Sequence, residues 1–222
     1  MRKKSIFLRH IWSYLLLFSV IFTAFFVSVF PLEHHGIIYR GMFTVIYFGA
    51  IMNMEKYRKQ LLIFTIIVMI ASWAAQFNNY PVLFSISRIL NLVFFLYIVS
   101  MLILQVARAR NVTPKVIMES IVGYLLLGIL FAILVGLAGF VDPDSFNFTQ
   151  STRYDIPVAD FSQDLYYTFI TMLTIGYGDY LPIKPYTRSL ATIIGVFGQM
   201  YMTIIIAMLV GKFASNPVVK ED

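Results

Sequence analysis

The stretch "TMLTIGYGDYLP", Thr171 to Pro182, places two glycines on either side of a tyrosine and follows them with an aspartate. It comes after only a short apolar run, in a chain whose other apolar segments are long. Glycine enters the left-handed backbone region at little cost, so Gly176 and Gly178 predict a backbone that alternates in hand. What such a backbone does depends on the segments around it.

Apolar residues dominate the chain and gather in long blocks. Of the 222 residues, 59% are hydrophobic and only 13% are charged, which is unlike a soluble domain. About 20 helical residues cross a hydrocarbon core of roughly 30 Å. We therefore expect an all-α integral membrane protein with six transmembrane helices. The six blocks lie at about 11–31, 37–54, 60–77, 89–107, 116–140 and 187–212.

Basic residues are unevenly divided between the loops. With six spans, alternate loops lie on the same side as both termini, and that side holds twelve of the 17 lysines and arginines. This bias predicts cytoplasmic termini, and we expect the plasma membrane. It also accounts for the net charge of +6 without nucleic acid as a partner. The basic residues of the other side are Arg40, Arg88, Arg153, Lys184 and Arg188.

The chain divides into two parts and a tail. Residues 1–107 hold four closely spaced helices, residues 108–213 hold two helices that flank a polar insertion, and residues 214–222 form a short cytoplasmic tail. Within the insertion, residues 161–173 predict a helix of about 12 residues, which is too short to cross a membrane. Non-helical backbone at membrane depth is tolerated only where it is packed in protein or lines a wet cavity. We therefore expect a re-entrant helix that leads into the glycine-containing stretch.

Alternating left-handed residues turn successive carbonyls toward one axis. Four copies of the stretch around that axis would present stacked oxygen rings from Thr174, Ile175, Gly176 and Tyr177, together with the Thr174 hydroxyl. Such rings replace the water around a dehydrated monovalent cation. The negative C-terminal end of the re-entrant helix favours a cation as well.

At these residues the sequence resembles the potassium-channel family, whose signature is Thr-x-x-Thr-x-Gly-Tyr-Gly-Asp. The fixed positions are matched by Thr171, Thr174, Gly176, Tyr177, Gly178 and Asp179. The resemblance extends over about 115–213 and implies an outer helix, a pore helix, a selectivity filter and an inner helix. It also implies a homotetramer in membrane lipid, with K+ as the permeant ion. The expected K+ ligands are Thr174, Ile175, Gly176, Tyr177 and Gly178, with Thr171 and Asp179 as supporting residues.

Some positions depart from the family's pattern. Tyr166 and Tyr167 stand where many relatives have tryptophans, in a cuff behind the filter, and Leu173 stands where a second threonine is common. Ile170 replaces a buried acid that in some relatives is the partner of the aspartate after the filter. A partner for Asp179 must therefore come from elsewhere, and the stability of the filter is the property in question.

Several glycines lie on the two helices of the pore part. Gly198 falls at the position of the family's inner-helix hinge, but a glycine that allows close packing explains it equally well. Gly128, Ala132 and Gly136 form a stripe of small residues on the outer helix, for which close helix packing is the expected role. Lys115 and Glu119 form an i,i+4 pair that we expect to be structural.

Other functions fit the sequence less well. A non-selective cation channel would be expected to disturb the Gly-Tyr-Gly core, which is intact. A secondary transporter tends to show repeated halves, whereas the sequence has a single re-entrant unit. A non-conducting membrane subunit is a further alternative. Constellations typical of metal sites, catalytic nucleophiles or phosphate loops are missing, so the sequence does not indicate an enzyme, and no cofactor besides K+ is expected.

The fourth apolar block lacks the charges of a voltage sensor. In "RILNLVFFLYIVSMLILQVARAR", Arg88 lies at the outer end, Arg108 and Arg110 lie at the inner end, and no charge stands between them. Steep voltage gating needs three or four moving charges in each subunit. We therefore expect a channel that is not strongly voltage-gated, with a gating stimulus that the sequence does not reveal.

Overall fold

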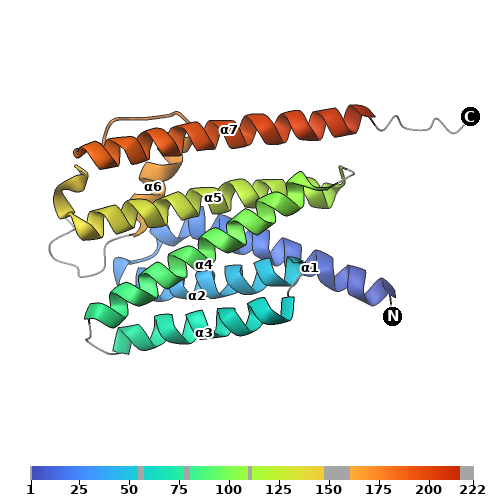
Figure 1. The fold of residues 1–222 in the computed structure, drawn as a ribbon, viewed down its shortest axis with the longest axis horizontal. Helices are drawn as coiled ribbons and strands as arrows, with labels where there is room; N and C mark the ends of the chain where they lie inside the picture. Colours follow the sequence, from blue (N-terminus) through green and yellow to red (C-terminus); the bar gives the residue numbers. More distant parts are fainter. Residues whose placement is uncertain (1, 55–57, 78–80, 110–111, 148–160, 216–222) are drawn as a thin grey trace, which may run out of the picture. The chain divides into compact units, whose positions relative to one another are not determined.

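The computed structural model describes residues 2–54, 58–77, 81–109, 112–147 and 161–215, and these ranges are almost entirely helical (Figure 1). Extended pairing in them is limited to an isolated bridge. A π-helical turn, η1 (Phe22–Phe26), and two 3₁₀ turns, η2 (Val27–Val29) and η3 (Pro143–Ser145), join the helices. The helices are α1 (Arg2–Ile21), α2 (Leu32–Asn53), α3 (Arg58–Phe77), α4 (Pro81–Ala107), α5 (Pro114–Val141), α6 (Phe161–Met172) and α7 (Pro185–Ser215).

A single long helix covers each of the last five apolar blocks, and α1 followed by η1 and η2 covers most of the first. Among the described residues, four segments are long and apolar enough to cross a membrane: Ile11–Val29, Ile89–Ala107, Pro114–Val141 and Pro185–Lys212. The apolar segment Lys59–Ile70 of α3 is shorter. The all-helical class is thus confirmed, while a count of six membrane spans stays a prediction.

The ends of two helices show how local sequence sets their bounds. Pro114 is the first residue of α5, a position that suits proline because its missing N–H group needs no partner there. The side chain of Thr113 caps the helix by accepting a hydrogen bond of 3.3 Å from the N–H of Val116. At the other end of the chain, α7 continues to Ser215, so the first residues of the predicted tail 214–222 are helical. The rest of that tail lies outside the described residues.

The chain forms two compact units, Met1–Leu102 and Ile103–Asp222, which divide within α4 a little before the boundary predicted at 107. In the first unit, aromatic rings join α2, α3 and α4. Tyr47 lies 5.4 Å from Phe94 and 5.8 Å from Phe95, measured between ring centroids, and Phe64 lies 5.0 Å from Phe94. The Tyr47 hydroxyl also donates a hydrogen bond to Asn91. Edge-to-face and tilted ring pairs of this kind add to the stability that burial provides.

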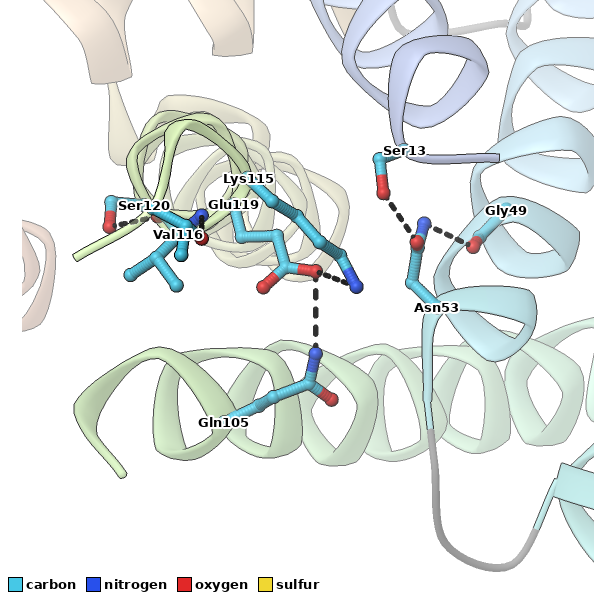
Figure 2. Close-up of polar contacts among 9 residues, drawn as sticks. Ser13, Gly49, Asn53, Gln105, Lys115, Val116, Glu119 and Ser120 are labelled. Atoms are coloured by element: carbon cyan, nitrogen blue, oxygen red, sulfur yellow. Dashed lines mark hydrogen bonds and ion pairs between the residues drawn. The ribbon is translucent and has the colours of Figure 1, made fainter. Parts of the chain in front are cut away.

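A buried amide joins α1 to the end of α2. Figure 2 shows Asn53 between Ser13 and Gly49: its Oδ1 accepts a hydrogen bond of 2.6 Å from Ser13 Oγ, and its Nδ2 donates one of 2.9 Å to the Gly49 carbonyl. Asn53 is fully buried, so both partners are needed to offset the loss of hydration. A Cβ on Gly49 would come within 3.2 Å of Leu16 Cβ, which explains a glycine at this close crossing.

In the second unit, α5, α6 and α7 pack on one another, and the short α6 lies between the two long helices (Figure 1). The predicted stripe of small residues on α5 forms the seat for α6. A Cβ on Gly128 would lie 2.6 Å from the Phe169 ring, and one on Gly136 would lie 2.6 Å from the Asp164 carboxylate. Close packing of α6, as expected from the stripe, is therefore confirmed.

Polar contacts join the end of α4 to α5 and α7 within this unit. The ion pair expected between Lys115 and Glu119 is present at 3.3 Å, and Gln105 Nε2 donates a longer hydrogen bond of 3.4 Å to the same carboxylate oxygen (Figure 2). Lys212, in the last turn of α7, donates a hydrogen bond of 3.2 Å to the Ala107 carbonyl at the end of α4. A cation there also meets the negative end of the helix dipole favourably.

Candidate functional site

The candidate site is the stretch that follows α6, residues 173–179. The 12 residues of α6 would span about 18 Å at the usual rise per residue, well short of a membrane. The length expected for a re-entrant helix is thus confirmed. The helix α6 packs against both α5 and α7, while the stretch that follows it, residues 173–179, is exposed in the single subunit.

The backbone of the stretch alternates in hand. Gly176 has φ of 54° and Gly178 has φ of 79°, which confirms the left-handed conformation expected for both. Thr174 also has a positive φ, 58°, and is the only non-glycine residue of the described ranges to do so. For a β-branched residue this conformation is strained, and such strain persists only where the surroundings hold it. The sequence placed Thr174 among the ligands but did not predict its conformation, because glycine was the only signal available.

The first part of the stretch is tied back to α6. The N–H groups of residues 173–176 donate hydrogen bonds of 2.9–3.2 Å to the carbonyls of Phe169, Ile170 and Thr171. These bonds satisfy carbonyls that a helix end leaves open. Within the described part of the chain, the carbonyls of residues 174–177 accept no such bond. The donors of the stretch are thus turned toward α6, and four successive carbonyls remain available to a partner outside the subunit.

Asp179 finds its partner in α6. Tyr166, one of the two tyrosines at the cuff positions, donates a hydrogen bond of 2.7 Å to Asp179 Oδ2. The acceptance of this bond by the carboxylate raises the pKa of Tyr166 to about 12, so the phenol stays protonated and continues to donate at neutral pH. The sequence left the partner of Asp179 unassigned. That partner is the phenol of Tyr166, since position 170 carries isoleucine and not an acid.

The chain after Asp179 is fixed to the segment that follows α5. Phe146 and Pro182 form an antiparallel bridge, in which the N–H of Asn147 donates to the Leu181 carbonyl at 2.8 Å. The Phe146 ring lies 5.2 Å from the ring of Tyr167, the second cuff tyrosine, which is buried. These contacts hold the C-terminal end of the stretch against α6.

The surroundings of Gly198 distinguish between its two interpretations, a hinge and a glycine that allows close packing. A Cβ at this position would lie 3.1 Å from Met172 Cβ and Cγ and 3.2 Å from Met172 Cα. In addition, α7 continues as one helix from Pro185 to Ser215. The glycine therefore allows α7 to approach the end of α6, which favours packing over a hinge.

One contact of the site was missed by the sequence reasoning. Gln199 of α7 reaches the Met172 carbonyl, the last of α6. The signal was available, because Gln199 is the one amide or charged side chain of α7 between Arg188 and Lys212.

Three comparisons with known proteins bear on this unit. Residues 129–215 match a protein-family model described as "Ion channel". A similar protein is Two-pore potassium channel 5 of Arabidopsis thaliana, 34% identical over 82 residues, which are 36% of this chain and 19% of that protein. The match thus spans about a fifth of the relative's length. No solved structure matches the chain.

The Tyr166–Asp179 contact generates a first prediction. Tyr166→Phe removes the donor to Asp179 and leaves the ring in place, so the end of the stretch should loosen. We expect hydrogen–deuterium exchange of the amides of residues 176–180 to become several-fold faster, with α5 and α7 unchanged. Tyr97→Phe removes the same atom from an exposed ring of α4 and is the matched control. Equal exchange in the wild type and Tyr166→Phe would show that the contact does not hold the stretch.

Proposed function

We propose that this membrane protein, whose residues 129–215 form an ion-channel domain similar to those of potassium channels, conducts K+ passively and selectively across the membrane. In this proposal residues 174–178 are the selectivity filter, α6 is the pore helix, α5 is the outer helix and α7 is the inner helix. Thr171, Tyr166, Tyr167 and Asp179 support the filter. An ion-channel domain transports rather than transforms its substrate, so no catalytic role is proposed.

The observation that carries the proposal is the alternation of positive φ at Thr174, Gly176 and Gly178. Alternation of hand directs successive carbonyls the same way, and those of residues 174–177 accept no backbone hydrogen bond within the described chain. Carbonyl rings of this kind replace the hydration shell of K+ in channels. The side chain of Thr174 would add a hydroxyl at the inner end of the filter.

A homotetramer is the assembly that the proposal requires. One subunit supplies one strand of a carbonyl ring, and a closed ring of identical subunits completes it. Large side chains of the proposed filter itself are exposed in the single subunit, with Tyr177 at 72% and Ile175 at 47%. Only 11% of the apolar window of α7 is buried, against 50% for α5. Both observations favour further copies of the chain packed around α7 and the filter.

The fourth helix supports a channel without strong voltage gating. Arg88 is the one basic residue in α4, Pro81–Ala107, and no acidic residue accompanies it there. One charge that crosses 100 mV yields about 2.3 kcal/mol, which is a quarter to a third of what steep gating uses in each subunit. We propose that Arg88 anchors the helix at the outer interface.

The selectivity of the filter is tested by flux into liposomes. We expect the wild type to pass K+ far more readily than Na+, and Gly178→Ala to lose conduction or selectivity. Space around Gly178 is open, so the effect comes from the left-handed backbone, at about 1–2 kcal/mol per residue. Gly41→Ala is the matched control, since Gly41 also has open space but lies in the helix α2, outside the proposed pore. Equal Na+ and K+ flux in the wild type would make the chain a non-selective channel instead.

Assembly is tested by native mass spectrometry of the detergent-purified protein. We expect a species with the mass of four chains, because ion coordination needs a four-fold ring. Chemical cross-linking in liposomes checks that the species exists in lipid. A stable monomer that still transports ions would contradict the model.

Voltage dependence is tested in planar bilayers over a wide voltage range. We expect the current to rise almost in proportion to voltage, as in a leak conductance. The current–voltage curve of Arg88→Gln should have the same shape. The reason is that a single interfacial charge supplies too little energy for a steep response. A steep conductance–voltage curve that flattens in Arg88→Gln would overturn the assignment of Arg88 as an anchor.

A further inference from the structure

The last carbonyl of α6 depends on a side chain from another helix. The carbonyls of Phe169, Ile170 and Thr171 are satisfied by the chain that directly follows them. The Met172 carbonyl is different, because it accepts a hydrogen bond of 2.8 Å from Gln199 Nε2 of α7. Of the open carbonyls at this helix end, it is the one whose partner comes from far along the sequence.

The amide of Gln199 is unusual in its helix. Between Arg188 and Lys212, the other side chains of α7 are apolar, aromatic, small or hydroxyl-bearing. An amide placed in an apolar environment costs free energy unless it is hydrogen-bonded. Since a carbonyl can only accept, the Met172 carbonyl also determines which end of the amide faces it. The bond thus gives a specific reason for a glutamine here.

Packing at Met172 keeps this bond short. Met172 is fully buried. On one side, Gly198 lets the α7 backbone come so close that an added Cβ would lie 3.1 Å from the Met172 side chain. On the other side, a Cβ on Gly128 of α5 would lie 3.4 Å from Met172 Sδ. Close-packed groups of this kind transmit displacement instead of absorbing it.

We propose that Gln199 is a positioning residue that fixes the inner end of the filter through the Met172 carbonyl and couples the position of α7 to the filter. The inference rests on the proposed function, because it takes residues 174–178 to be a selectivity filter. The contact between Gln199 and Met172 does not depend on that function. Thr174, the first left-handed residue, is two residues beyond Met172. A shift of α7 at Gly198–Gln199 therefore acts on the strained backbone at Thr174 through Met172 and Leu173.

The test is Gln199→Met, which keeps a long side chain in the space and removes the donor. Gln60→Met, the same substitution at an exposed glutamine of α3 outside the proposed pore, is the matched control. The first readout is hydrogen–deuterium exchange of residues 173–176, whose N–H groups bond to the end of α6. We expect exchange about fivefold faster in Gln199→Met, the factor that corresponds to one net hydrogen bond of about 1 kcal/mol. The control should exchange as the wild type does.

The second readout is conduction. In liposomes, Gln199→Met should form the same oligomer as the wild type but pass Na+ relative to K+ at a several-fold higher ratio. Unchanged exchange together with unchanged selectivity would overturn the proposal. If the wild type conducts no K+ but exchange still rises in Gln199→Met, the proposed function fails while the anchoring role of Gln199 stands.

Discussion

The second unit depends on one constraint: four successive backbone carbonyls, those of residues 174–177, have no backbone partner in the described part of their own subunit. The carbonyls of residues 174–177 accept no backbone hydrogen bond in the described chain, while the N–H groups just before and among them are bonded to α6. Residues 174–177 are exposed in the single subunit, and a backbone carbonyl is a strong acceptor, so these four carbonyls are open to water or to a partner outside the subunit. A ring of identical strands around a cation is the partner that we propose.

The surrounding elements keep the stretch in this strained form. At its N-terminal end, the open carbonyls of α6 are matched by the N–H groups of residues 173–176 and by Gln199. At its C-terminal end, the Tyr166 phenol holds the Asp179 carboxylate, and the bridge between Phe146 and Pro182 fixes the chain that follows. Strain at Thr174 therefore lies between two anchored ends, the situation in which unfavourable dihedrals persist.

Glycines serve two different purposes in this unit. At Gly176 and Gly178 the backbone has positive φ and the space around is open, so the conformation itself requires glycine. At Gly198 the helix is regular and the space is filled by Met172, so the small size requires it. The first unit relies on other means: aromatic pairs around Tyr47 and the buried, hydrogen-bonded amide of Asn53 hold its helices together. This arrangement contains no row of charges along α4.

Local features of the sequence determined much of the architecture. Apolar blocks of sufficient length predicted the long helices, and the spacing of Gly176 and Gly178 predicted left-handed backbone. These features are visible in sequence because each depends on neighbouring residues and on simple costs of burial or dihedral angle. The length of α6 was predictable for the same reason.

The tertiary structure alone decided which distant residues meet. Nothing local to Asp179 indicates that a tyrosine of α6 is its partner, and nothing local to Gly198 separates a hinge from a packing glycine. The contact of Gln199 with Met172 and the positive φ of Thr174 likewise depend on how α5, α6 and α7 pack. Crossing positions of helices are set by the fit of whole surfaces, in which each residue contributes little, so a single residue and its neighbours do not encode them.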